Sequence, residues 1–128
     1  MINEPSIYFN TMRKLLTVMA IILSIPLPTK AQTVFELEAG QSMLMTGKGP
    51  GQDATNNPFQ GEDCLAVIKN TGDESFSIRI QQKGAILEII PVPPKKTTKI
   101  KLFVGQELYL DSENKTRASV TYEKLPAP

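Results

Sequence analysis

Apolar and polar positions alternate along much of the chain, most clearly between residues 62 and 82. Residues 64–68, Cys-Leu-Ala-Val-Ile, are apolar on both alternating faces, which is typical of a strand covered on both sides. Phe76, Ile78 and Ile80 then share one face of a second segment, with polar residues between them. The pattern therefore predicts two strands around which the rest of the fold is packed.

Two tight reversals are expected near this pair of strands. Residues 70–73, Asn-Thr-Gly-Asp, tolerate positive φ, so the sequence predicts that the two strands form a hairpin. Lys83-Gly84 predicts a second reversal. In residues 85–90, which follow it, apolar residues are adjacent rather than alternating, and this predicts a strand covered on both faces.

Shorter segments with the same character predict further strands at residues 33–38, 43–45, 98–104, 108–110 and 118–122. Prolines in residues 91–94 cannot donate to a sheet, so we expect this segment to cross from one sheet to the other. In residues 98–104 the alternation places one set inward, namely Ile100, Leu102 and Val104, and the other outward, namely Lys99, Lys101 and Phe103.

About seven short strands at spacings of roughly ten residues, without any helical period, predict an all-β fold. Several strands are apolar on one face only, as two packed sheets require, so we expect a small antiparallel two-sheet sandwich. An immunoglobulin-like topology is the expected strand order. The cysteine–tryptophan–cysteine core of that fold is absent, because the chain has one cysteine and no tryptophan.

The N-terminal segment has the build of a secretory signal peptide. Arg13 and Lys14 precede an apolar run at residues 15–27, which is too short to span a bilayer that needs about 20 apolar residues. Small residues lead up to a cleavage site expected between Ala31 and Gln32. The sequence thus predicts a signal peptide at residues 1–31 and a single β-sandwich domain at residues 32–128, with no transmembrane segment.

The charge and the cysteine content limit the expected cellular compartment and the expected kinds of partner. Cleavage would remove Arg13, Lys14, Lys30 and Glu4 and change the net charge from +1 to −1, which gives no electrostatic reason to expect nucleic acid. The single cysteine, Cys64, is interpreted as a small buried side chain or as a link between two chains. Export without internal disulfides favours a bacterial periplasmic or surface protein.

The residue types needed for catalysis are sparse. The chain has no histidine, so Ser–His and Cys–His nucleophiles and a cupredoxin-like copper site are excluded. Neighbouring acids occur at strand ends, where solvated carboxylates are ordinary, in the sets Glu62-Asp63, Asp73-Glu74 and Asp111/Glu113. We therefore expect a protein that is not an enzyme and that needs no cofactor or metal.

One long irregular segment, residues 46–61, is rich in glycine and proline and is the expected binding loop. It resembles neither a phosphate-binding loop, since no helix follows it, nor a calcium loop. A passive connection between the sheets is the alternative. The candidate binding residues are Lys48, Gln52, Asp53, Asn56, Asn57 and Phe59.

Part of this loop carries a short family resemblance. Residues 57–61, Asn-Pro-Phe-Gln-Gly, resemble the Asn-Pro-x-x-Gly loop of chagasin-like cysteine-protease inhibitors, which are small exported immunoglobulin-like sandwiches. The resemblance covers five residues and implies an exported protein that binds another protein. The glycine-rich and Arg-Pro-Trp loops of those inhibitors have no counterpart in the chain.

The interpretation that combines these observations is an exported, non-catalytic β-sandwich that acts by protein–protein contact in the bacterial periplasm or at the cell surface. One alternative is a ligand-binding module that uses residues 46–61. Another is a structural subunit that assembles by pairing of sheet edges, so that the partner is another protein or a further copy. Lys99 and Lys101 are interpreted as charges that protect an edge strand, rather than as an anion site.

Overall fold

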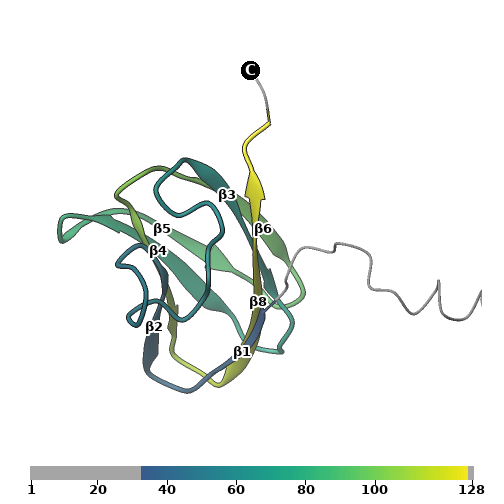
Figure 1. Ribbon diagram of the computed structural model, residues 1–128. Helices are drawn as coiled ribbons and strands as arrows, with labels where there is room; N and C mark the ends of the chain where they lie inside the picture. Colours follow the sequence, from purple (N-terminus) through teal and green to yellow (C-terminus); the bar gives the residue numbers. More distant parts are fainter. Residues whose placement is uncertain (1–32, 127–128) are drawn as a thin grey trace, which may run out of the picture.

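The protein folds as two antiparallel four-stranded sheets packed face to face (Figure 1). The computed structural model describes residues 33–126, and the expected signal peptide at residues 1–31, with its cleavage site, lies outside them. Within the described residues there is no helix, and therefore none that could span a membrane. The strands are β1 (Thr33–Leu37), β2 (Gln41–Thr46), β3 (Cys64–Asn70), β4 (Phe76–Gln82), β5 (Ala85–Val92), β6 (Thr97–Leu102), β7 (Glu107–Ser112) and β8 (Thr116–Lys124).

The expected all-β sandwich is confirmed, but its strand order is that of a jelly roll. One sheet has the order β1-β8-β3-β6 and the other β2-β7-β4-β5. Only β4 and β5 are consecutive strands that pair with each other, and every other connection crosses between the sheets. In an immunoglobulin-like domain the consecutive strands A and B, D and E, and F and G lie in the same sheet, whereas a jelly roll is built from eight strands in two sheets. The expected immunoglobulin-like order of about seven strands is therefore wrong.

The expected hairpin at residues 70–73 is one of these crossings. β3 and β4 belong to different sheets, and Asn70 is fully buried where the chain passes between them. Its side-chain amide donates to the carbonyl oxygens of Glu74 and Val92, at 2.7 and 2.9 Å. A Cβ atom at Gly72 would lie 2.2 Å from Oγ1 of Thr116, so close packing against β8 requires glycine here. The asparagine and glycine that predicted a hairpin turn thus form a connection between the two sheets.

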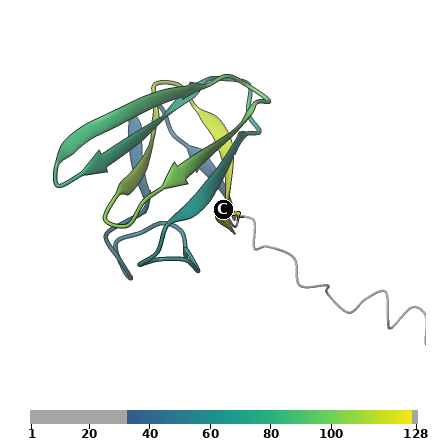
Figure 2. The ribbon, with the colours of Figure 1, turned by 90° about the horizontal axis from the view of Figure 1, so that it is seen from above.

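The second reversal, at Lys83-Gly84, is a true hairpin, as expected. Lys83 has φ 50° and Gly84 has φ 79°, which is the combination that a two-residue type I′ turn needs. The hairpin of β4 and β5 extends beyond the body of the sandwich (Figures 1 and 2). It also carries a β-bulge, because the pairing shifts between Ile80, which lies opposite Glu88, and Gln81, which lies opposite Ile86. Leu87 is the additional residue.

The hydrophobic core lies between the two sheets and takes alternate residues from their inner faces. Ile100 and Leu102 point inward as expected, but Val104 lies beyond the end of β6 and is 53% exposed. The fully buried apolar side chains include Leu37, Met45, Cys64, Ala66, Ile68, Ile78, Val92, Leu108, Leu110 and Ala118. These contacts fix the two sheets relative to each other.

Two strands that were expected to be covered on both faces have only partial cover. In β3 the inner residues are buried, while Leu65 and Val67 on the outer face are half-buried between neighbouring strands. In β5 the expectation is wrong, because Ile86, Leu87 and Ile89 are 56%, 53% and 58% exposed. β5 is an edge strand on a projecting hairpin, so among the described residues no second layer lies over this exposed part of it.

Candidate functional site

The segment expected to bind a ligand, residues 46–61, uses much of its polar chemistry to hold its own shape. The carboxylate of Asp53 accepts backbone N–H groups from Gly47, Lys48 and Gly49, at 3.1, 2.9 and 3.1 Å. Gly47 has φ 131° and lies against the backbone of Glu107, where a Cβ atom would approach to 2.6 Å. Asp53 is therefore an organiser of the loop, and its oxygens are largely occupied.

Asn57 is also buried in the protein interior. Its side chain is 6% exposed, donates to Sγ of Cys64 at 3.6 Å and accepts from the backbone N–H of Phe59 at 2.9 Å. Of the other expected binding residues, Lys48, Gln52 and Asn56 are exposed and Phe59 is half-buried against the core. The six residues therefore do not converge on one polar site.

Beneath this loop lies a small apolar cavity of about 290 Å³, lined by Thr33, Thr55, Asn56, Pro58, Phe59, Val120 and Tyr122. The hydroxyl groups of Thr55 and Tyr122 are 2.5 Å apart and hydrogen-bonded to each other. Burial raises the pKa of Tyr122 well above its usual range, and burial likewise raises the pKa of the Cys64 thiol. Both groups are neutral at pH 7, so neither is activated as a nucleophile.

The resemblance of residues 57–61 to chagasin-like inhibitors does not extend to structure. Asn57 faces the interior and holds the turn to Phe59, so its amide is not presented to a partner. The strand order also differs from the immunoglobulin-like order of that family. The five matching residues make a turn that fits the sandwich locally.

The outer face of the β2-β7-β4-β5 sheet carries a connected polar cluster that the sequence analysis missed. The guanidinium of Arg79 on β4 binds both carboxylate oxygens of Asp111 on β7, at 2.8 and 3.0 Å. Ser42 on β2 donates to Asp111 at 2.5 Å and accepts from Arg79 at 2.7 Å. The guanidinium also lies 4.2 Å from the ring centroid of Tyr109. Strands far apart in the sequence supply these residues, so no local pattern pointed to them.

These contacts set the protonation of the cluster. The hydrogen bonds from Arg79 hold the pKa of Asp111 below its ordinary value, and the same contact raises the pKa of Arg79. Both groups are therefore charged at neutral pH and satisfy each other. The cluster fixes β2, β4 and β7 side by side, but it leaves no basic or nucleophilic group free for catalysis.

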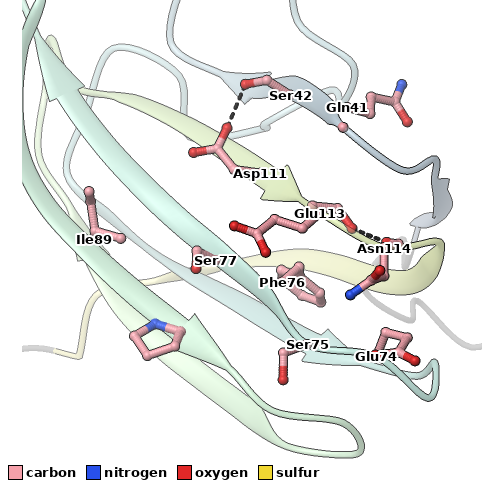
Figure 3. A pocket seen from close by; sticks show the side chains of 13 residues that line it. Gln41, Ser42, Glu74, Ser75, Phe76, Ser77, Ile89, Asp111, Glu113 and Asn114 are labelled. Carbon is pink, nitrogen blue, oxygen red and sulfur yellow. Dashed lines mark hydrogen bonds between the residues drawn. The ribbon is translucent and has the colours of Figure 1, made fainter.

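An open depression of about 740 Å³ lies beside this cluster, and Figure 3 shows the side chains that line it. Ser42 and Asp111 border it on one side and Ile89 of β5 on the other, with Ser77 between them. The carboxylates of Glu74 and Glu113 also line it. Within residues 33–126 no group of three or more histidine, cysteine, aspartate or glutamate side chains is placed to hold a metal ion.

The edge of β5 carries three of the exposed large apolar side chains of the described residues, Ile86, Leu87 and Ile89. Ile86 and Ile89 lie opposite Gln81 and Arg79 of β4, so both point to the outer face of the sheet. The opposite side of β5 pairs with no strand among the described residues and offers its backbone N–H and C=O groups to the surroundings. The run of apolar residues that predicted a covered strand thus lies on an exposed edge.

The strand β6, which forms one of the two edges of the other sheet, has the opposite character. Lys99 and Lys101 are exposed on it, which agrees with the expectation that these lysines mark an edge strand. Nζ of Lys99 lies 3.8 Å from Glu123 on β8. Positive charges along β6 oppose pairing with another edge of the same kind.

No protein-family model and no curated protein matches the sequence. Among solved structures, the chain is similar to PirA, with a TM-score of 0.55 and 15% identity over 78% of this chain and 100% of that one. A Bacillus endospore appendage from a family of disulfide-linked pili gives 0.46, with 12% identity over 77% and 88% of the two chains. The Yersinia pseudotuberculosis-derived mitogen gives 0.43, with 12% identity over 80% and 91%. The match to PirA shows a shared fold alone, and the two lower scores carry no argument.

Proposed function

We propose that this protein is an exported, non-catalytic β-sandwich that acts by protein–protein contact, and that the edge of β5 is the contact surface. One observation carries the proposal: Ile86, Leu87 and Ile89 are each more than half exposed on a strand edge that pairs with nothing else in residues 33–126. Edge strands that must stay unpaired are usually covered, interrupted or charged, and of these devices β5 carries the bulge at Leu87 and the single charge of Glu88, with apolar side chains at most other positions. An edge that is left apolar fits addition of a strand from a partner.

The chemistry of the rest of the surface supports a binding role over a catalytic one. The cluster around Arg79 is internally neutralised, and the buried Cys64 thiol is kept protonated by desolvation. Asp53 and Asn57 in the expected binding loop serve the loop itself. The proposed compartment, the periplasm or the cell surface, rests on the signal-like residues 1–31.

The test is affinity capture of the tagged full chain from the cells that export it, followed by mass spectrometry. We expect the captured proteins, including any untagged copy of this chain, to be lost with Ile89→Lys and retained with Lys101→Ala. Both residues are exposed on edge strands, so neither substitution disturbs the core. A captured set that Ile89→Lys leaves intact would refute the role of β5. Substrate turnover that Asp111→Asn or Glu62→Gln abolishes would refute the non-catalytic assignment.

A further inference from the structure

We infer that the partner of the β5 edge is a second copy of this chain, bound through antiparallel β5–β5 pairing about a two-fold axis that passes between Leu87 and Glu88. This inference rests on the proposed contact at β5 and adds its occupant and register. In this arrangement Ile86 of each copy lies opposite Ile89 of the other. The two β2-β7-β4-β5 sheets then join into one continuous sheet.

The limits of the open edge define the register in which β5 would pair with its own copy. Gly84 belongs to the hairpin turn, and Pro91 has no N–H to donate, so the stretch available for a ladder is residues 85–90. The midpoint of that stretch lies between Leu87 and Glu88. A two-fold axis at this point places the whole open stretch opposite its own copy, with no residue left over on either side.

The side-chain directions agree with this register. Ile86 and Ile89 face outward, because they lie opposite Gln81 and Arg79 of β4. Glu88 lies opposite the buried Ile80 and therefore faces the other side. Directly opposed residues of an antiparallel pair point to the same face, so Ile86 can oppose Ile89 of the second copy. The bulge at Leu87 makes this possible, because without it Ile86 and Ile89 would point to opposite faces.

Charge also distinguishes β5 from the edge strand β6 as a site for a second copy. Residues 85–90 contain one charged side chain, Glu88, and the net charge is +1 for the full chain and −1 after the expected cleavage, so repulsion between copies is weak. Pairing β6 with its own copy would instead bring the exposed Lys99 and Lys101 of both copies together. A foreign extended segment would satisfy the backbone of β5 equally well, whereas a second copy also supplies an isoleucine opposite each exposed isoleucine.

The expected complex is a closed and weak dimer. Two-fold pairing uses the β5 edge of both copies, so this contact cannot propagate into a fibre. A contact of six residues on each side buries less surface than a standard interface, which buries roughly 1,600 Å² in total. Contacts of this smaller size are transient. We expect half-dimerisation at about 10–100 µM.

The first experiment is analytical sedimentation of the protein purified from the cells that export it, across a concentration range of about 1–300 µM. We expect a reversible monomer–dimer equilibrium that Ile89→Lys weakens at least tenfold and that Lys101→Ala leaves unchanged. Ile86→Lys is a second variant with the same expected loss, and circular dichroism verifies that each variant is folded. Monomer throughout the range, or a dimer that both isoleucine variants leave intact, would overturn the inference.

The second experiment determines the register by mixing two single-cysteine variants, Ile86→Cys and Ile89→Cys, with oxidised glutathione as the oxidant. Opposed residues of an antiparallel pair have Cα atoms about 5 Å apart, which a disulfide spans. The native Cys64 is fully buried and does not compete. We expect a disulfide-linked dimer from the mixture and none from either variant alone. Cross-linking of one variant with itself would show another register and overturn this one.

Sedimentation and affinity capture together distinguish a failure of this inference from a failure of the proposed function. If the chain stays monomeric while Ile89→Lys still removes a captured foreign protein, then β5 is a contact surface whose occupant is not a second copy. If neither self-association nor capture depends on Ile89, both proposals fail.

Discussion

The consecutive strands β5 and β6 each end one sheet of the sandwich, yet they present opposite chemistry to the surroundings. On β6 the inward residues Ile100 and Leu102 are buried and the outward positions include Lys99 and Lys101. On β5 apolar residues remain exposed at most positions, and only Val92, at its end, is buried. A strand edge is thus protected in one sheet and left open in the other.

The difference follows from where each strand lies relative to the core. β6 pairs along its length with the central strand β3 and faces the opposite sheet. Its alternate side chains therefore point into the core and to the surroundings in turn. β5 pairs with β4 on a hairpin that extends past the sandwich, so neither of its faces has a full covering layer. Apolar residues on β5 therefore contribute little to folding. Their presence there is the observation on which the proposed contact at β5 rests.

The largest expected effect concerns stability. We expect Ile100→Ala on β6 to lower the free energy of unfolding by about 2–4 kcal/mol, because it leaves a cavity between the sheets. The matched change Ile89→Ala on β5 should cost below about 0.5 kcal/mol, since that side chain is 58% exposed. Urea denaturation of monomer at low concentration measures both. Equal losses would mean that β5 is part of the folding core.

The features of this fold that the sequence predicts are those that depend on residues close together in the chain. Alternation and short apolar runs together located every strand, because both are local signals of β-structure. It did not give the strand order, because glycine and asparagine at residues 70–73 are equally suited to a hairpin and to a crossing between sheets. In the structure, Asn70 and Gly72 are explained by contacts with β5 and β8, which are distant in sequence.

The candidate sites were less predictable for a related reason. Residues 85–90 have the same apolar composition whether a second layer covers them or a partner does, so the sequence predicted the commoner case. The Arg79–Asp111–Ser42 cluster joins three strands and becomes visible only once β7 is known to pair with both β2 and β4. Asp53 and Asn57 were correctly placed in a loop, but which of their atoms were already bonded could not be known.

The next effect in size tests whether lysines alone keep β6 unpaired. Replacing Lys99 and Lys101 together by isoleucine should make β6 resemble β5 and add a second self-associating edge. We expect species larger than a dimer at concentrations at least tenfold below those at which wild-type protein shows any. Light scattering measures this, and the double change to serine is the control, since it removes charge without adding apolar surface. An unchanged size distribution would show that β6 is protected by its geometry instead.

A smaller effect concerns the sheet that carries β5. The pKa of Asp111 is lowered by Arg79, so the ionised carboxylate stabilises the fold; this contribution is complete above the ordinary value of 3.8 and is lost as the pH falls through the lower folded value. Because the pair is partly exposed, Asp111→Asn should cost at most about 1 kcal/mol at pH 7. Urea titrations at pH 7 and below pH 4 measure the difference, which should shrink in acid. A pH-independent difference would assign the cost to packing.

The smallest effect concerns the charge that remains on the open edge. In the two-fold pairing, Glu88 of one copy lies diagonally across from Glu88 of the other, on the face opposite Ile86 and Ile89, so the two carboxylates repel each other. Glu88→Gln should therefore strengthen the dimer about twofold, and added salt should strengthen the wild-type dimer but not the variant. Sedimentation at low and high ionic strength measures this. Glu113→Gln, on an exposed residue outside β5, is the control. If Glu88→Gln weakens association, Glu88 contacts a cation or donor on its partner. Such a result would favour a foreign segment over a second copy, because residues 85–90 offer no positive charge to pair with it.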